Sequence, residues 1–307
     1  MGTHIMRTAF TICLLIASVS AQTTHRSVEF ARVHRYCEGP VFDADGNLFV
    51  SHIPYISKIA PDGTVTRWAE TGRPNGHKVL PDGTHLVADL TVLRLDRNGT
   101  IVGTAAQDCG GRPLGQVNDI TLDSDGGFYF TDPGRLPEAV EKPIGKLCYV
   151  GRDGRSRLLA DGLRYPNGLV LTASGDALLV GEFLENRIFE FRLTAPGTVS
   201  QRRVFAELPS KTTATLSGPD GMALDSTGRL YVAHYGFGAV RVIDPSGRVV
   251  DSLSLPFEGT TNVVFAGTSK NLLYVTGGGA GVVTGGGVVS EGPGFVHRFD
   301  LSKSAGR

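Results

Sequence analysis

The sequence predicts an all-β fold, a six-bladed β-propeller, and three observations support this prediction. First, a short apolar strand, a polar turn that usually contains glycine, and a second strand rich in β-branched or aromatic residues recur six times. Second, the glycines of the first five turns are spaced at 37, 43, 49 and 53 residues, the repeat length of a four-stranded blade. Third, 41 Gly and 16 Pro, with hardly any apolar run at helical spacing, favour many short strands joined by turns. The six ribbons lie at residues 38–52, 73–89, 115–132, 165–182, 217–234 and 260–277.

The remaining segments fit the outer strands of the blades. Residues 27–35 have strand character but no ribbon of their own, so we expect them to pair with residues 294–301 and complete the last blade. Pairing the two ends of the chain would cover an otherwise open sheet edge. We therefore assign residues 22–307 to a single propeller domain. Further turn sequences mark where the two outer strands of a blade connect, at residues 61–64, 96–100, 151–155 and 244–248.

Residues 1–21 have the pattern of a secretory signal peptide. Arg7 supplies the positive charge, residues 9–17 form a short apolar run, and small residues precede a cleavage point after Ala21. Residues 1–5 are either a cloning remnant or an alternative start, and they are left out of the fold prediction. The apolar run is too short to span a bilayer, so we expect a secreted or periplasmic protein without a membrane anchor.

The balance of charge excludes some classes of partner. Thirty basic residues offset thirty acidic ones, so no net field favours nucleic acid or an anionic membrane surface. A small neutral or weakly charged ligand fits better, and we expect a monomer. With 41% hydrophobic residues, the chain is able to form a substantial core.

Three cysteines remain in the predicted mature chain, Cys37, Cys109 and Cys148. An odd number in an oxidising compartment is consistent with one disulfide and one buried thiol, but the sequence does not select the pair. Zinc binding by these three residues is disfavoured because no CxxC or CxxH spacing occurs.

Polar side chains recur at the same end of five ribbons. Residues that enter the first strand of a ribbon should lie opposite residues that leave the second strand. Because the innermost ribbons of a propeller radiate from one channel, their equivalent ends should form a ring around its mouth. The entering residues are Glu38, Asn75, Asn118, Asn167 and Asp220, and the residues expected opposite them are His52, Asp89, Asp132, Glu182 and His234.

The chemistry of this ring favours a hard divalent cation. Carboxylate and amide oxygens without thiolates match Ca²⁺ first, with Mg²⁺ and Mn²⁺ as further candidates. Two carboxylates would offset the charge of the ion, and the amide oxygens add ligands without adding repulsion. The histidines His52 and His234 keep Zn²⁺ among the alternatives.

Several segments share their sequence and their order with one known family. These segments are EGPVF, VNDI with GGFYFTDPG, YPNGLVL, GPDGMALDSTGRLYVAHYG with VRVIDPSG, and NVVFAG with LLYVT. From Glu38 to about Gly279 the chain is similar to the family of senescence marker protein 30, gluconolactonases and luciferin-regenerating enzymes. The resemblance implies a six-bladed propeller with one divalent ion held by Glu38, Asn167 and Asp220. It also implies that Asn118 acts at the ion directly or through a water, and that Asp220 is the general base.

The chain departs from this family at one position. Members that act on sugar lactones often carry an arginine two positions before the asparagine that matches Asn118, and that arginine binds substrate hydroxyls. Here the position is Gln116. The resemblance therefore supports metal binding but does not specify a sugar lactone.

The leading hypothesis is metal-dependent hydrolysis of a lactone. The ion would polarise the carbonyl oxygen, and Asp220 would accept a proton from the attacking water. The other ring side chains would orient the substrate. The residues expected to contact it are Asn118, Gln116, Asp132, His52, His234 and Glu182.

Other functional classes are either disfavoured or left open. No GxSxG nucleophile motif occurs, and the glycine-rich residues 277–287 lack the Lys-Ser/Thr of a phosphate loop, so we interpret them as a flexible loop over one face. A non-catalytic metal-containing propeller that binds a sugar or a protein partner is one alternative. A propeller enzyme similar to strictosidine synthase is another.

Overall fold

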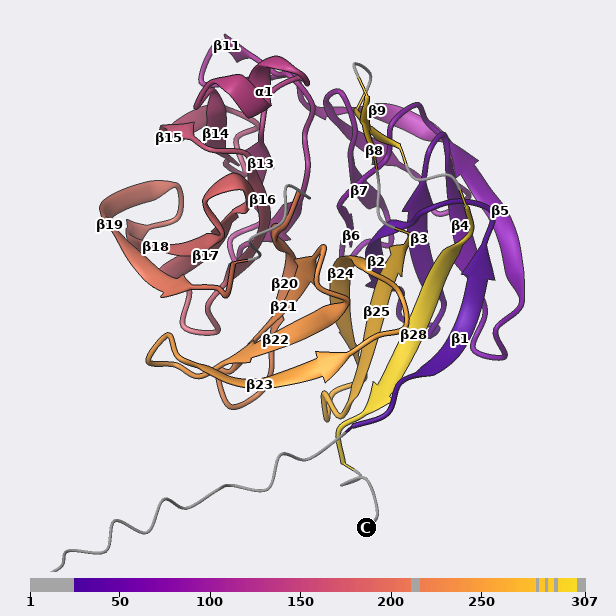
Figure 1. The fold of residues 1–307 in the computed structure, drawn as a ribbon. Helices are drawn as coiled ribbons and strands as arrows, with labels where there is room; N and C mark the ends of the chain where they lie inside the picture. The colour runs from indigo at the N-terminus through magenta and orange to yellow at the C-terminus, as the bar shows by residue number, and fades with distance from the viewer. Residues whose placement is uncertain (1–24, 211–215, 280–281, 285–286, 290–291, 303–307) are drawn as a thin grey trace, which may run out of the picture.

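The computed structural model describes residues 25–210, 216–279, 282–284, 287–289 and 292–302, and these form a six-bladed β-propeller, as predicted (Figure 1). The proposed signal peptide lies outside the described residues. No helix among the described residues is long and apolar enough to cross a membrane.

Each blade is a four-stranded antiparallel sheet. In blades one to five the first strand in chain order faces the central channel, and in blade six β24 does so. Blades one and two contain β2 (Glu38–Phe42), β3 (Leu48–His52), β4 (Tyr55–Ile59) and β5 (Val65–Glu70), then β6 (His77–Val79), β7 (His85–Ala88), β8 (Val92–Leu95) and β9 (Ile101–Ala106). Blades three and four contain β12 (Ile120–Leu122), β13 (Phe128–Asp132), β14 (Gly145–Val150) and β15 (Ser156–Leu163), then β16 (Pro166–Leu171), β17 (Ala177–Glu182), β18 (Arg187–Ala195) and β19 (Thr198–Glu207). Blades five and six contain β20 (Gly218–Leu224), β21 (Leu230–Tyr235), β22 (Ala239–Ile243) and β23 (Val249–Ser254), then β24 (Gly259–Ala266), β25 (Leu272–Gly278), β28 (Gly294–Asp300) and β1 (Val28–Val33).

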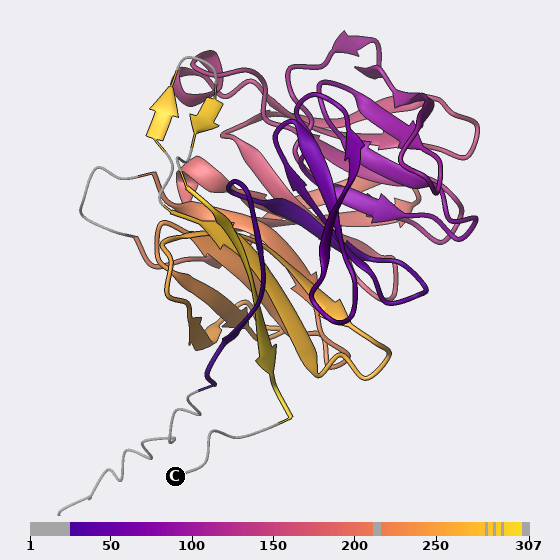
Figure 2. The same ribbon diagram turned by 90° about the vertical axis from the view of Figure 1, so that its right-hand side faces the viewer.

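The two ends of the described chain close the ring. Strand β1 pairs with β28, and Val28 lies opposite Arg298 in the antiparallel register. The predicted pairing of residues 27–35 with residues 294–301 is therefore confirmed. Figure 2 shows β1 running alongside the last blade.

Apolar side chains fill the space between neighbouring blades. Leu86 of blade two packs with Ile120 and Phe130 of blade three, and all three are almost fully buried. Burying a side chain of this size contributes about 1.5–3 kcal/mol. A disulfide joins Cys109 of β10 (Asp108–Cys109) to Cys148 of β14, and Cys37 is a buried free thiol. The sequence allowed this division into one disulfide and one thiol without selecting the pair.

Short elements stand on one face of the propeller. The helix α1 (Glu138–Glu141) lies between β13 and β14, the 3₁₀ helix η1 (Phe183–Glu185) lies between β17 and β18, and the strand β11 (Arg112–Pro113) precedes β12. The hairpin of β26 (Val282–Thr284) and β27 (Gly287–Val289) protrudes from the face that carries α1 (Figure 2).

The prediction of a flexible loop over residues 277–287 is wrong for part of this segment. Gly277 and Gly278 belong to β25, and residues 282–284 and 287 pair in the β26–β27 hairpin. The valines on both sides of the tract favour strand pairing. Gly277 is required by close packing, because a Cβ atom there would lie 2.3 Å from the Gly259 carbonyl oxygen and 2.4 Å from the Phe257 ring.

Candidate active site

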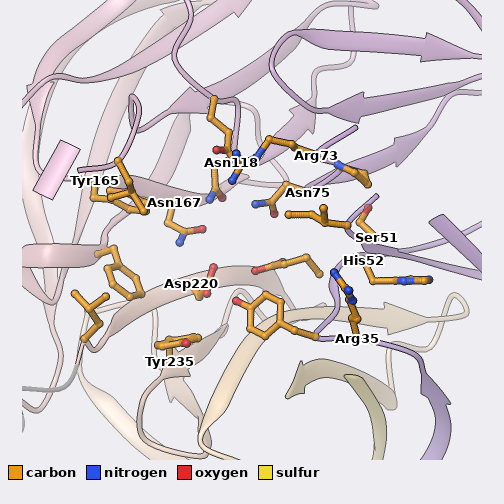
Figure 3. Close-up of a pocket in the computed structure, with 18 of the residues that line it drawn as sticks. Arg35, Ser51, His52, Arg73, Asn75, Asn118, Tyr165, Asn167, Asp220 and Tyr235 are labelled. Atoms are coloured by element: carbon orange, nitrogen blue, oxygen red, sulfur yellow. The ribbon is translucent and has the colours of Figure 1, made fainter. Parts of the chain in front are cut away.

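The five predicted ring residues line one pocket at the mouth of the central channel (Figure 3). Glu38, Asn118, Asn167 and Asp220 are buried, and Asn75 is half-buried. Five different blades each contribute one of these side chains, so the fold brings together residues that are up to 182 positions apart in the sequence. The structure thus brings the five predicted side chains together in one pocket, and their roles there stay predictions.

A β-bulge lies at the ring position in several inner hairpins. Glu38 pairs with Ser51, and Pro219 pairs with His234, and a register shift follows each of these pairs. The predicted opposition of Glu38 to His52 and of Asp220 to His234 is therefore wrong by one residue. A bulge adds one unpaired residue and turns its side chain, so the ring residue and the predicted partner no longer share a face.

In blade four, the predicted opposition of Asn167 to Glu182 is also wrong by one residue. Pro166, rather than Asn167, pairs with Glu182, and a register shift follows between Pro166 and Leu169. The bulge lets Asn167 face the channel mouth while the strand continues into the apolar core.

Two buried carboxylates dominate the electrostatics of the pocket. Burial raises the pKa of Glu38 to about 7, although the amide of Gly39 at 3.0 Å and Nδ2 of Asn262 at 3.2 Å donate to its Oε2. Burial also raises the pKa of Asp220 well above its usual range, and the charges of Glu38 and Asp119 raise it further. Like charges at such close quarters are stable only with a compensating cation or a retained proton.

The oxygens of the ring fit a divalent cation. The side-chain oxygens Asn75 Oδ1, Asn167 Oδ1 and Asp220 Oδ1 are buried and accept no hydrogen bond from the described residues. Leaving a buried acceptor unsatisfied costs about 1–3 kcal/mol, and a bound cation would satisfy several at once. Within the described residues no cluster of three or more His, Cys, Asp or Glu side chains occurs, so the donors are two carboxylates and three amides. Oxygen donors of this kind suit Ca²⁺ or Mg²⁺ better than Zn²⁺.

Comparison with known proteins identifies the family. The family model for the SMP-30/gluconolactonase/LRE-like region matches residues 35–279. The chain belongs to this family. It is 25% identical over 269 residues to diisopropyl-fluorophosphatase from Loligo vulgaris, covering 78% of this chain and 84% of that protein. It is 28% identical over 242 residues to lactonase drp35 from Staphylococcus aureus, covering 75% of this chain and 72% of that protein.

Solved structures share the fold. The calcium-binding protein regucalcin from Agrobacterium tumefaciens superposes with a TM-score of 0.71 at 22% identity, covering 88% of this chain and 96% of that chain. At this identity the likeness concerns the propeller architecture. The family membership and the ring together direct attention to the remaining side chains of the pocket.

Three of the predicted substrate contacts are not among the residues that line the pocket. Asp132 accepts hydrogen bonds from the amides of Gly115 and Gln116 and lies 2.9 Å from Lys146 Nζ. Its carboxylate is fully buried, so it holds the loop that carries Gln116. The structure thus places Asp132 behind the site as a positioning residue.

Glu182 and His234 have similar roles. Glu182 accepts the amide of Arg164 at 2.7 Å and lies 2.6 Å from Arg187 Nε. His234 has Asn186 Oδ1 2.9 Å from its Nε2, and it accepts Arg241 Nε at 3.1 Å. Both side chains are buried, and neither is supported as a substrate contact.

His52 and Gln116, in contrast, line the pocket. His52 Nε2 lies 2.7 Å from Ser57 Oγ, and burial lowers the pKa of His52 to about 4. The imidazole is therefore neutral at neutral pH and is able to act as a hydrogen-bonding group. Both residues stay predicted contacts for the substrate.

Sequence reasoning missed an aromatic wall. Tyr36, Tyr165, Phe183 and Tyr235 line the pocket, and Figure 3 places Tyr165 and Tyr235 on the side of the pocket away from His52. Tyr165 has a φ of 60°, a conformation that is uncommon for a bulky residue and that recurs at functional sites. Burial raises the pKa of Tyr165 to about 12, so its phenol stays protonated and is able to donate a hydrogen bond. The YPNG sequence contained a signal, since it places Tyr165 two residues before Asn167.

Sequence reasoning also missed two arginines. Arg35 and Arg73 line the same pocket, and Figure 3 places Arg73 beside Asn75 and Arg35 beside His52. Arg73 stands two positions before Asn75, as Gln116 stands two positions before Asn118, and this repeat was visible in the sequence.

Proposed function

We propose that this protein hydrolyses lactones with the help of a divalent cation bound at the ring. One observation carries the proposal: two buried carboxylates and three amide side chains from five blades meet in one pocket, and three of their oxygens accept no hydrogen bond from the described residues. Membership of the SMP-30/gluconolactonase/LRE-like family and the similarity to the lactonase from Staphylococcus aureus support lactone hydrolysis. The fold shared with the calcium-binding protein regucalcin supports Ca²⁺ as the ion.

The residues that would hold the cation are Glu38, Asn167 and Asp220, with Asn118 acting directly or through a water. When bound, the cation supplies Lewis-acid polarisation of the lactone carbonyl. Asp220 accepts a proton from water as the water oxygen bonds to the carbonyl carbon. The bond between that carbon and the ring oxygen then breaks, and the proton passes to the departing alkoxide. The product is an open-chain hydroxy acid, and the atoms and charges balance.

The aromatic wall limits the access of bulk water to the reacting atoms. Phe183 and Tyr235 cover part of the pocket with apolar ring surface, and the protonated phenol of Tyr165 is a hydrogen-bond donor within it. Hydrogen bonds and charges act more strongly in such a partly dry environment than in open water.

We also propose that the protein is exported. The predicted signal peptide at residues 1–21 motivates this proposal. The disulfide between Cys109 and Cys148 supports it, since such bonds persist in oxidising compartments and are uncommon in the cytosol. Mass spectrometry of the protein recovered from the medium or periplasm should show an N-terminus after Ala21. Recovery only in the cytosol with an intact N-terminus would refute export.

The decisive experiment combines elemental analysis with a panel of lactones. The purified protein should contain about one divalent ion per chain, release acid from at least one lactone, lose that activity to a chelator, and regain it with calcium. Asp220→Asn should abolish turnover while the circular dichroism spectrum is unchanged. A tightly bound ion without turnover of any lactone would instead favour a non-catalytic binding propeller.

A further inference from the structure

Blades two and three hold the loop before the ring asparagine by the same device, a buried aspartate that accepts a hydrogen bond from a backbone amide of the loop. In blade three, Asp132 Oδ1 accepts the amide of Gln116 at 3.1 Å, sixteen residues earlier in the chain. In blade two, Asp89 Oδ2 accepts the amide of Arg73 at 2.8 Å, again sixteen residues earlier. Arg73 and Gln116 therefore occupy equivalent positions on adjacent blades. Each lies two residues before a ring asparagine, and a buried carboxylate accepts a hydrogen bond from its backbone amide.

This device fixes Arg73 more firmly than an ordinary loop residue. Asp89 is 5% exposed, and its Oδ2 also accepts the hydroxyl of Thr71 at 2.8 Å, while its Oδ1 accepts the amide of Leu90 at 2.7 Å. The backbone on both sides of the strand end is thus anchored, and Arg73 Nε is buried. A guanidinium presented from an anchored backbone loses little conformational freedom on binding a ligand.

Arg35 adds a second positive charge to the pocket. It is exposed at the mouth, and among the described residues no carboxylate lies within 4.0 Å of its guanidinium. Other arginines near this face hold acids, as Arg187 does with Glu182 and Arg164 with Glu185. Figure 3 places Arg35 near His52 and Ser51, on the side of the pocket opposite Tyr165.

The local charge of the pocket differs from the neutral balance of the whole chain. Its lining contains two carboxylates, Glu38 and Asp220, and two arginines. A divalent cation would offset the two carboxylates, so the lining residues together would then carry a net positive charge. Figure 3 places Tyr165 and Tyr235 on the side of the pocket away from Arg35. The pocket is therefore polarised between a cationic side and an apolar side.

We propose that Arg73, assisted by Arg35, recognises a carboxylate on the substrate, so that the preferred substrates are lactones that carry a carboxylate group. This inference rests on the proposed lactone hydrolysis. An arginine pairs with a carboxylate through two parallel hydrogen bonds, which fixes the orientation of the ligand as well as its charge. The arginine of blade two thereby supplies the guanidinium that blade three lacks at Gln116. The charge balance of the whole chain favours a neutral or weakly charged ligand, whereas the charges that line the pocket favour an anionic one.

A matched pair of probes tests the assignment. 5-Oxotetrahydrofuran-2-carboxylate and 5-(hydroxymethyl)oxolan-2-one share the lactone ring and differ in the carboxylate. For the calcium-loaded protein, kcat/KM should be at least about tenfold higher for the carboxylate probe, because a charge-assisted pair is formed with it alone. Arg73→Gln should reduce this preference at least about tenfold, and Arg73→Lys should retain part of it. Arg35→Gln should produce a smaller reduction, since this side chain is exposed.

The matched control is Arg164→Gln. On blade four, Glu182 accepts the amide of Arg164, three residues before Asn167, and the Arg164 side chain does not line the pocket. The substitution removes the same charge from the same face and should preserve the preference for the carboxylate probe. An equal loss in the Arg73 and Arg164 variants would overturn the assignment, because it would indicate a general electrostatic effect. An unchanged preference in Arg73→Gln, or no preference in the wild-type protein, would also overturn it.

Calorimetry separates this inference from the proposed function. Oxolane-2-carboxylate and (oxolan-2-yl)methanol, which have no lactone bond to hydrolyse and differ in the same carboxylate, are the probes here, and they are titrated into calcium-loaded wild-type protein and calcium-loaded Arg73→Gln. Tighter binding of the carboxylate probe that is lost in the variant supports the assignment even if neither lactone is hydrolysed by the calcium-loaded protein, a result that would refute lactone hydrolysis alone. Equal binding of the two probes by the wild-type protein, or an unchanged difference in Arg73→Gln, would overturn the assignment of Arg73.

Discussion

Glu38 and Asp220 are buried together at one mouth of the propeller channel, where burial first and then the charge of Glu38 raise the pKa of the Asp220 carboxyl. In the absence of a cation this pair destabilises the fold, because each charge is desolvated and repels the other. A ligand that binds the folded state and neutralises the pair should therefore stabilise the protein.

We predict that calcium raises the midpoint of thermal unfolding and that Glu38→Gln removes this effect. At a calcium concentration one hundred times the dissociation constant, the expected stabilisation of the wild-type protein is about 2.7 kcal/mol. In Glu38→Gln the metal-free protein should be at least as stable as the wild type, since the repulsion is gone, but calcium should add much less. Differential scanning fluorimetry with calcium or with chelator measures both quantities. A full calcium response in Glu38→Gln would exclude Glu38 as a ligand.

The part of the site that could be predicted is the part that repeats in the sequence. Glu38, Asn118, Asn167 and Asp220 occupy one register of a recurring ribbon, and a ring of blades brings equal registers together whatever the details of packing. The bulges beside Glu38 and Asp220 were not predictable, because they depend on how inner strands pack around the channel rather than on a local residue pattern. This is why His234 was expected opposite Asp220 and lies instead beside Asn186 and Arg241.

Residues that act across blades are harder to predict than residues that repeat. Arg35 lies before the first ribbon, outside the recurring pattern, so repetition does not single it out, and the structure places it beside His52. Likewise three cysteines permit three pairings, and the choice follows from the 5.6 Å between the Cα atoms of Cys109 and Cys148, a distance set by the fold of blade three.

The pair of histidines in blade two predicts acid sensitivity. His77 Nε2 lies 2.8 Å from His85 Nδ1, and burial lowers the pKa of His77 well below its usual range and that of His85 to about 4. Both imidazoles are neutral in the folded state, whereas the unfolded chain protonates them below about pH 6.5. Stability contributed by this difference is present above pH 6.5 and is lost as the pH falls toward 4.

Substitution of His85 should make this loss shallower. In His85→Gln, the slope of unfolding free energy against pH between 6.5 and 4 should decrease by up to about 1.4 kcal/mol per pH unit, which corresponds to one proton. Urea unfolding at several pH values measures the slope. Val92→Ala removes buried apolar surface from the same blade but no titratable group, and it serves as the control: it should lower stability without changing the slope. Equal slopes in His85→Gln and the wild type would refute the assignment.

The disulfide of blade three should contribute strongly to stability. Cys109 and Cys148 are 39 positions apart, and closing a loop of this length in the unfolded chain corresponds to about 4 kcal/mol in the chain-entropy model. Replacing both cysteines by serine should lower the free energy of unfolding by an amount of this order, measured with urea. Cys37→Ala is the control, because it should remain sensitive to a reducing agent while the double variant should not. A double variant as stable as the wild type would contradict the prediction.

Lys146 and Asp132 form a buried pair whose partners should be interdependent. The Lys146 side chain is 12% exposed and the Asp132 side chain 0%, and Nζ lies 2.9 Å from Oδ2. Lys146→Met would leave a buried carboxylate without its cation, so we expect a loss of about 3–5 kcal/mol in the free energy of unfolding. Adding Asp132→Asn to Lys146→Met removes the uncompensated charge and should recover part of this loss, although the amide nitrogen in place of Oδ2 no longer accepts the hydrogen bond of the Gly115 amide. Because that hydrogen bond helps to hold the pocket loop, the double variant should regain stability without regaining full activity on lactones. A double-mutant cycle on urea unfolding, read beside kcat/KM, checks both outcomes, and strictly additive losses would show that the two side chains act independently.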